Sequence, residues 1–315
     1  MQRARLVWLS LWHLECLSLT RVCARQPDYI AGGATQNTIR VAQWMLGARA
    51  KTAYIGCIGD DEFGRKLSDA ATADGVETHY QVDTEAATGT CAVLINNTER
   101  SLIANLAAAN NYKLSHFEDA ERQAVLSRAS IVYSSGFFLT VSPDSMVVAG
   151  KHCAENGKVY AINLAAPFIP PVCAEGLAKV TYYADYVFGN ESEAASWAAA
   201  NGMEGATSAE VATAIAKLPK ANGARGRVVV ITHGAEPTVA CVNGEVREFP
   251  CDVKLAKEAI VDQNGAGDGF VGGFLTALAL GKNLDECVRC GQFAARVVLC
   301  ASGCQLPKEA PVYEW

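Results

Sequence analysis

The sequence predicts an α/β fold in which a largely parallel sheet is flanked by helices. Three observations predict it. From Tyr29 onward, short apolar runs alternate with helical patterns, as in chains built from strand–helix units. The chain contains no internal repeat and no low-complexity linker. A hydrophobic fraction of 50% over 315 residues is a globular composition with enough apolar material for a large core.

The predicted elements follow one another along the chain. Ser142 is a suitable N-cap and Pro143 a suitable first residue for one of the helices. The segment 77–105 differs from the rest, because it offers short extended pieces without long helices, and we expect a small β lid there. A strand-like run also ends at Asp262. We expect strands at 52–59, 130–136, 159–164, 186–190 and 228–234. We expect helices at 60–75, 142–157, 267–280 and 285–304, and one more that begins after Gly33 in the stretch 31–47.

Charge and cysteine usage narrow the class of protein. The net charge of −6 gives no sign of a nucleic-acid or membrane-surface partner. Most of the 12 cysteines lie in apolar runs, as buried reduced thiols do, so we expect a cytoplasmic protein. Cys287 and Cys290 form a C-x-x-C, followed by Cys300 and Cys304, and four such residues are a possible zinc set. The sequence around these four cysteines predicts one continuous helix. Core packing is therefore the favoured interpretation.

The first 28 residues stand apart from this pattern. Arg3 and Arg5 precede the apolar "LVWLSLW", a combination typical of signal peptides. His13 and Glu15 then interrupt the apolar run, and no clean small-residue cleavage site follows. We therefore do not interpret this segment as a signal peptide. No apolar run approaches the ~18 residues of a membrane span.

The segment "DQNGAGDGFVGGFL" (262–275) carries the clearest chemistry. Gly265, Ala266 and Gly267 lie at a predicted helix N-terminus, where free N–H groups and the helix dipole attract anions. Asp268 at the same point would be repelled by a bound anion unless it accepts a proton from a hydroxyl beside it. This arrangement suits phosphoryl transfer to an alcohol. The alternative is an N-capping aspartate after a glycine-rich turn, and the segment alone does not separate the two.

Two further segments have both a functional and a structural interpretation. Gly32 and Gly33 precede the helix of "AGGATQNTIRVAQWMLG", and Gln36 and Asn37 lie in its first turn. Amides there can bind sugar hydroxyls, or the glycines simply form a loop. Asn190 and Glu193 in "FGNESEA" can hold hydrated Mg²⁺ near phosphates, or can form a capping box. Taken alone, the structural interpretation is favoured for each.

Together, the order "GG…N", "NxxE" and "DxxGAGD" resembles the ribokinase-like (PfkB) carbohydrate kinases. The longer stretches "RVAQWML", "ERSLIANLAAANNY", "GFFLTVSPDS" and "INLAAPFI" are similar to the adenosine kinases of that family, from about Tyr29 to Pro311. The resemblance implies a ribokinase-like domain over 29–315 that transfers the γ-phosphoryl group of ATP to the 5′-hydroxyl of adenosine with Mg²⁺. It implies no nucleic-acid or membrane partner, and a monomer.

The resemblance also implies roles for single residues. Asp268 matches the catalytic base, and Gly265, Ala266 and Gly267 match the anion hole. Leu102 and Phe138 match the apolar wall around adenine, although ordinary core packing would also explain both residues. The implied substrate contacts are Gly32, Gly33, Asn37, Leu102, Phe138 and Asn264; the implied phosphate contacts are Arg100, Asn190, Glu193 and Gly234, with Glu193 reaching Mg²⁺ through water.

The N-terminal segment departs from the family. There, a strand reading roughly Gly-Asn-Pro-Leu-Leu-Asp-Ile precedes the lid, and its aspartate binds the ribose hydroxyls. Nothing in residues 1–28 matches it, and Asp28 has the wrong context because it directly precedes "YIAGG". We therefore expect a missing central strand, an incomplete lid and one substrate carboxylate fewer. Two alternatives stay open: a related sugar kinase, and a non-catalytic nucleoside- or nucleotide-binding protein.

Overall fold

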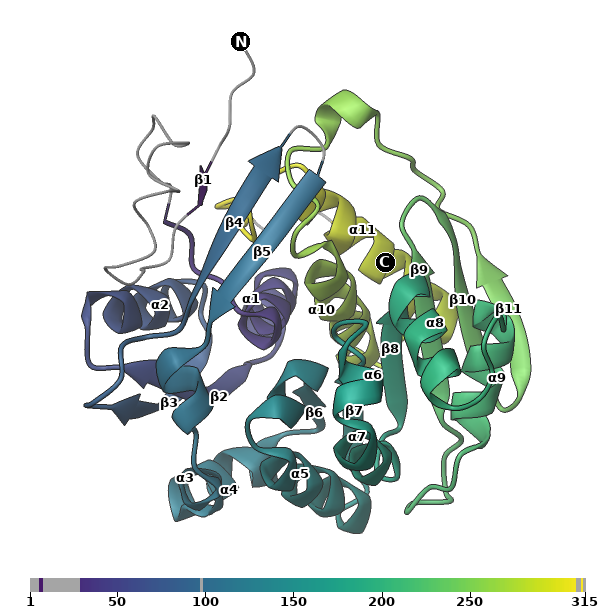
Figure 1. The fold of residues 1–315 in the computed structure, drawn as a ribbon, viewed down its shortest axis with the longest axis horizontal. Helices are drawn as coiled ribbons and strands as arrows, with labels where there is room; N and C mark the ends of the chain where they lie inside the picture. Colours follow the sequence, from purple (N-terminus) through teal and green to yellow (C-terminus); the bar gives the residue numbers. More distant parts are fainter. Residues whose placement is uncertain (1–5, 8–28, 97–98, 310–312, 314–315) are drawn as a thin grey trace.

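A six-stranded sheet forms the centre of the computed structural model, which describes residues 6–7, 29–96, 99–309 and 313 (Figure 1). Its strand order is β11-β10-β9-β8-β7-β6. The four strands from β6 to β9 are parallel, and β10 and β11 extend the sheet as antiparallel strands. The strands are β6 (Ile131–Ser134), β7 (Val159–Asn163), β8 (Tyr186–Asn190), β9 (Val228–His233), β10 (Glu236–Val242) and β11 (Glu245–Phe249).

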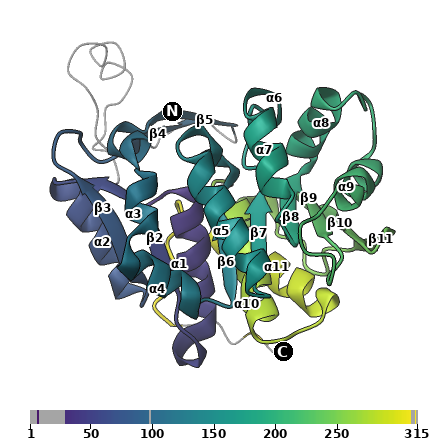
Figure 2. The same cartoon turned by 90° about the horizontal axis from the view of Figure 1, so that it is seen from below.

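Helices cover both faces of this sheet and form a core on each (Figure 2). Successive residues of a strand point to opposite faces, so Tyr160 and Ile162 of β7 lie in one core and Ala161 in the other. All three are fully buried, as expected for a parallel strand covered on both sides. The first face carries α5 (Pro143–Glu155), α6 (Ile169–Val172), α7 (Ala174–Thr181), α8 (Glu191–Ala200) and α9 (Ser208–Lys217); the second carries α1 (Ala34–Leu46), α10 (Ala266–Ala279) and α11 (Leu284–Leu299).

A separate pair of parallel strands lies beside this unit. β2 (Ala53–Gly59) and β3 (Glu77–Asp83) pair along seven residues, and α2 (Glu62–Ala73) connects them. Among the described residues, β2 pairs with β3 alone and β6 with β7 alone. The two sheets therefore each end at an open edge, β2 in one and β6 in the other.

An antiparallel hairpin completes the strands. β4 (Thr90–Asn96) pairs with β5 (Glu99–Asn105), and the short β1 (Leu6–Val7) pairs with β4 opposite Val93 and Leu94. The segment 77–105 therefore contributes to two sheets, since its first strand joins β2. The shorter helices are η1 (Gly47–Arg49), η2 (Ala107–Asn111), α3 (Leu114–Glu118), α4 (Ala120–Arg128), η3 (Gly136–Thr140) and η4 (Lys257–Ala259).

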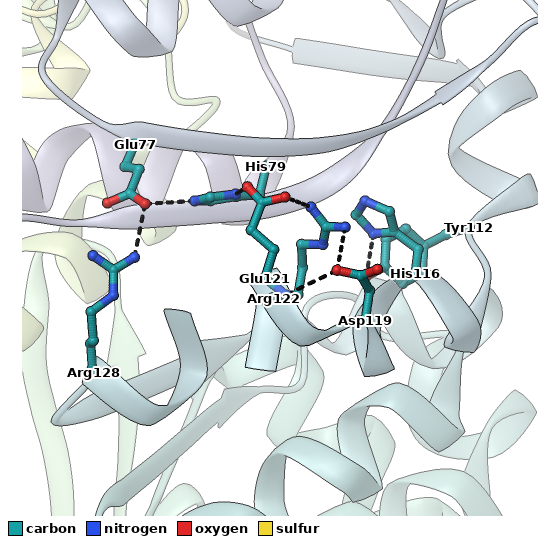
Figure 3. Close-up of polar contacts among 8 residues, drawn as sticks. All are labelled: Glu77, His79, Tyr112, His116, Asp119, Glu121, Arg122 and Arg128. Carbon is teal, nitrogen blue, oxygen red and sulfur yellow. Dashed lines mark hydrogen bonds and ion pairs between the residues drawn. The ribbon is translucent and has the colours of Figure 1, made fainter. Parts of the chain in front are cut away.

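Side-chain ion pairs join β3 to the helices that precede β6 (Figure 3). His79 contacts Glu77 through Nε2 at 2.7 Å and Glu121 of α4 through Nδ1 at 3.1 Å. Arg128 at the end of α4 contacts Glu77 at 2.9 Å. Arg122 contacts Glu121 at 2.6 Å. These side chains hold the two-stranded sheet against the α4–β6 connection without a strand ladder.

Most predicted elements are confirmed, and two are corrected. The strand-like run that ends at Asp262 is wrong, because Lys257–Ala259 form a 3₁₀ turn and the following residues are irregular. The helix predicted over 285–304 ends at Leu299, so Cys300 and Cys304 lie beyond it. The predicted core packing of the C-x-x-C is confirmed, because Cys287 and Cys290 of α11 are buried in the core on the second face of the sheet. Most of the divergent N-terminal segment, residues 1–5 and 8–28, lies outside the described residues, and so do the predictions of a missing central strand and a missing substrate carboxylate.

No helix in the described part of the chain has the length and apolar character that a membrane span requires.

Candidate active site

A cavity of about 1490 Å³ lies where the second-face helices, the hairpin and the two open sheet edges meet. It brings together residues that are far apart in the sequence. Most of the predicted site residues line it: Gly32, Gly33, Asn37, Leu102, Phe138, Asn190, Glu193, Asn264, Gly265 and Asp268.

The N-terminus of α10 enters this cavity through a glycine turn. Gly265 is the N-cap and has φ +80°, a left-handed conformation that a side chain would strain. A Cβ on Gly265 would also approach Val298 to 3.4 Å. At Gly267 a Cβ would meet no atom within 4 Å, so the backbone faces open space. The first N–H groups of the helix are therefore accessible to an anion.

Asp268 occupies the first turn of α10 and is bound by a residue from α1. Asn37 Nδ2 donates a hydrogen bond to Asp268 Oδ2 at 3.0 Å. Burial raises the pKa of Asp268 to about 7, opposed by the Asn37 hydrogen bond and reinforced by the charge of Glu193. The alternative prediction of an N-capping aspartate is wrong, because the N-cap is Gly265 and no side chain caps it. A half-buried carboxylate that lines a cavity and has a pKa close to neutral is suited to proton transfer.

The start of α1 supplies the other polar groups. Gly33 has φ +98° and its carbonyl accepts from Asn37 N at 2.8 Å, which fixes the first turn. Asn37 Oδ1 is buried and has no hydrogen-bond partner in the described structure. A buried, unpaired acceptor is costly, and a ligand hydroxyl in the cavity would satisfy it. Gln36, in the same turn, accepts from Tyr80 Oη at 2.6 Å and holds α1 against β3.

Asn190 and Glu193 form a capping box at the start of α8, as the structural interpretation predicted. Glu193 Oε2 accepts from Asn190 N at 3.0 Å, and Oε1 accepts from Asn190 Nδ2 at 2.9 Å. Burial raises the pKa of Glu193 to about 7. The same residues line the cavity that contains Asp268, so the capping role and a role toward a ligand are compatible.

Aromatic and aliphatic side chains form the rest of the wall. Phe138 packs edge-on against Tyr112, with ring centroids 5.3 Å apart, while Leu102 is 58% exposed on the hairpin. Phe137 and Phe168 form a second ring pair at 6.1 Å, and both line the cavity. Sequence reasoning missed Phe168, although "APF" directly after the strand at 159–164 was a usable signal.

Two of the predicted phosphate contacts, Arg100 and Gly234, are not among the described residues that line this cavity. Arg100 lies in β5 opposite Ile95, and its side chain lies outside the described part of the structure. Gly234 has φ +56° in the turn between β9 and β10 and is absent from the described lining. Asn264 lines the cavity, but its side chain donates to Asp262 Oδ1 at 2.9 Å and thereby stabilises the loop before α10. Within the described residues, no cluster of three or more His, Cys, Asp or Glu side chains forms a metal site.

Comparison with known proteins extends the resemblance to almost the whole chain. Adenosine kinase 1 of Arabidopsis thaliana is 48% identical over 282 residues, which are 90% of this chain and 82% of the relative. Adenosine kinase of Dictyostelium discoideum is 43% identical over 284 residues, which are 90% of this chain and 83% of the relative.

Solved structures give the same result for the fold. Adenosine kinase of Anopheles gambiae, in complex with P1,P4-di(adenosine-5) tetraphosphate, superposes with a TM-score of 0.87 at 42% identity, covering 93% of this chain and 88% of that one. Adenosine kinase of Schistosoma mansoni with 2-fluoroadenosine gives 0.88 at 31% identity, with coverages of 95% and 88%. The family described as pfkB family carbohydrate kinase matches residues 15–311. The chain therefore belongs to the pfkB family of carbohydrate kinases and has the ribokinase-like fold of its adenosine kinase relatives.

Proposed function

We propose that this protein is a nucleoside kinase that transfers the γ-phosphoryl group of ATP to the 5′-hydroxyl of adenosine, giving AMP and ADP. The observation that carries the proposal is Asp268, a half-buried carboxylate held by Asn37 at the N-terminus of α10. Its cavity also has an apolar wall suited to a purine. The relatives named adenosine kinase support the same reaction.

We assign the proton and charge movements to different groups. The ionised Asp268 accepts the proton of the attacking hydroxyl, which forms its bond to the γ-phosphorus as the bond to the ADP oxygen breaks. The N–H groups of Ala266 and Gly267 at the start of α10 stabilise the negative charge of the transferred group. Asn37 positions Asp268 through Nδ2 and leaves Oδ1 for a sugar hydroxyl.

Mg²⁺ fits this site only through water. Both carboxylate oxygens of Glu193 already accept hydrogen bonds from Asn190, so the pair is better suited to binding water molecules of a hydrated ion than to direct ligation. When bound, the ion would neutralise charge on the phosphates of ATP.

The rate should depend on pH around neutrality. The base is active only when ionised, and the pKa of Asp268 is raised to about 7 by burial. We therefore expect kcat/KM for adenosine to rise between about pH 6 and pH 8 and then level off. Because Glu193 has a similar raised pKa, the rise reports the coupled pair rather than one carboxyl group. Initial rates from pH 5.5 to 9 test this, and a flat profile down to the lowest pH would contradict it.

Arg100 is expected to contact the transferring phosphate. Arg100→Lys keeps the positive charge but loses the bidentate donor fork, so kcat should fall more than KM for adenosine rises. Steady-state kinetics with both substrates varied measure this. Arg247→Lys, on the exposed ion pair with Asp285 and outside the described cavity lining, is the matched control and should leave both constants unchanged. An unchanged kcat with a large rise in adenosine KM would place Arg100 in the nucleoside pocket instead.

Two measurements on one preparation separate this function from its alternatives. ATP-dependent phosphorylation is measured with adenosine, ribose and fructose as acceptors, and nucleotide binding is measured by calorimetry on the same preparation. Preferential phosphorylation of adenosine is expected. Turnover of the free sugars alone would identify a sugar kinase, and nucleotide binding without any turnover would identify a binding protein.

A further inference from the structure

The root of the β4–β5 hairpin, residues 87–89 and 106–108, is bound to the rest of the fold through Thr88. This threonine is 4% exposed, and both of its donors bind the carboxylate of Asp61. Its N–H donates to Asp61 Oδ2 at 2.8 Å, and its Oγ1 donates to Asp61 Oδ1 at 2.7 Å. The same Oγ1 accepts from Gly59 N at 3.0 Å. The hydroxyl of Thr88 is therefore used both as a donor and as an acceptor.

The acceptor of these bonds is an ionised carboxylate. Burial acts to raise the pKa of Asp61, but the hydrogen bonds from Thr88 and from the first turn of α2 outweigh it and lower the pKa. The side chain is therefore charged at neutral pH. Hydrogen bonds to a charged acceptor are roughly twice as strong as bonds between neutral groups, and Thr88 donates two of them.

The two chain segments of the hairpin root lie directly against each other. Ala108 N donates to Ala87 O at 2.9 Å. A Cβ on Gly89 would approach Leu106 O to 2.6 Å, so the outgoing and returning chains meet at this glycine. Both ends of the hairpin are therefore fixed where Thr88 binds Asp61, and the hairpin extends from there.

Beyond its root, the hairpin forms part of the apolar wall of the cavity. Cys91 lies opposite Ala104 and Val93 opposite Leu102, and all four residues line the cavity. Leu102 is nevertheless largely exposed, so a bound ligand would remove apolar surface of this side chain from water. The contribution of this wall to ligand affinity depends on where the hairpin root holds it.

The hairpin root and the candidate catalytic carboxylate are attached to neighbouring helices. Asp61 is the N-cap of α2. Gln36 Nε2 of α1 donates to Leu67 O of α2 at 3.1 Å, and the next residue of α1, Asn37, holds Asp268. The hydrogen bonds of Thr88 therefore fix the hairpin relative to the same helices that position Asp268.

We propose that Thr88 is a positioning residue for the nucleoside. By holding the hairpin root on Asp61, it fixes the position of Leu102 over the bound adenine and so determines the affinity for the acceptor. The identity of the acceptor rests on the function proposed above, whereas the attachment rests on the hydrogen bonds of Thr88 alone. These bonds go to Asp61 and Gly59, so their loss should raise KM for adenosine and leave phosphoryl transfer by the Asp268 site intact.

The test compares two substitutions of Thr88 in the full chain. Thr88→Val keeps the shape but removes the hydroxyl, which leaves Gly59 N without its acceptor, and it should raise KM for adenosine about tenfold. The kcat and the KM for ATP should stay within about twofold. Thr88→Ser restores the hydroxyl and should restore KM. The matched control is Thr213→Val, which removes a hydroxyl bonded to Ala209 O within α9 and should change neither constant.

A second variant tests the same attachment from the other side. Asp61→Asn keeps a good N-cap for α2 but replaces one of the two acceptors of Thr88 with a donor, so it should also raise KM for adenosine. This variant keeps the proposal testable if Thr88→Val does not fold.

Hydrogen–deuterium exchange of the free protein provides a readout that needs no turnover. Thr88→Val and Asp61→Asn should each speed exchange in 90–105 and leave β8 unchanged, and Thr88→Ser should match the unsubstituted chain. A chain that exchanges as expected but neither binds nor phosphorylates adenosine would overturn the proposed function and keep the attachment. Unchanged exchange in 90–105, or a fall in kcat at constant KM, would overturn the role given to Thr88.

Discussion

Asp268→Asn is expected to lower kcat for adenosine phosphorylation by roughly 10²–10⁴-fold, the usual contribution of a positioned acid–base group. Asparagine has the same shape, so Asn37 keeps a neighbour at 3.0 Å, but the amide cannot accept the proton of the 5′-hydroxyl. The fold should persist, because the variant removes a buried carboxyl group whose ionisation is opposed by burial. Single-turnover rates and a thermal melt of the same sample measure the two effects.

Asp144→Asn is the matched control for this variant. Asp144 also lies in the first turn of a helix, α5, but its helix belongs to the other face of the sheet. The substitution should leave kcat unchanged. Near-normal turnover of the Asp268 variant would show that this carboxylate is structural, and the proposed mechanism would fail.

Replacing residues 1–28 with a segment that contains a Gly-Asn-Pro-Leu-Leu-Asp-Ile strand and its part of the lid is expected to raise both stability and activity. Each buried main-chain group that gains a partner along β2 removes a cost of about 1–3 kcal/mol. The added aspartate would supply two hydrogen bonds from a charged group to the ribose, each about 1.5–3 kcal/mol. Because about 1.4 kcal/mol corresponds to a tenfold change in affinity, kcat/KM should rise by roughly two to four orders of magnitude.

The same chimera with asparagine in place of the new aspartate separates the two contributions. It should keep the higher melting temperature and lose most of the gain in kcat/KM. ATP-dependent AMP formation and a thermal melt on all three proteins complete the test. If the chain as it stands matches the chimera in both measurements, the aspartate is dispensable, and another group must hold the ribose.

The strands and the catalytic helix could be predicted because their signals are local. The run "VVVIT" marks β9, and the glycines before Asp268 mark the start of α10 without reference to the rest of the chain. The run before Asp262 was misread for the same reason. Its apolar residues resemble a strand, but the main chain of 261–262 donates to Leu299 O at the end of α11. The loop is fixed further by Asp262 accepting from Asn264 and Gly303.

Long-range relationships could not be predicted from the sequence. The pairing of β3 with β2 is parallel and separates it from the hairpin that follows it directly in the chain. The raised pKa of Asp268 depends on burial by distant segments, and the hydrogen bond from Asn37 spans 231 positions. Phe168 contributes to the cavity wall only because the loop after β7 brings it beside Phe137.

The attachment of β2 and β3 has a consequence for how the protein unfolds. They are held to the α4–β6 connection by His79, Glu77, Glu121 and Arg128, and these contacts are mostly exposed ion pairs. Exposed pairs contribute little and weaken further in salt. High salt should therefore loosen the α4 side of the two-stranded unit first, while Tyr80 on Gln36 and Asp74 on the buried Arg40 keep the unit attached to α1. Local opening on the α4 side is then distinct from global unfolding, and one free energy of unfolding does not describe both.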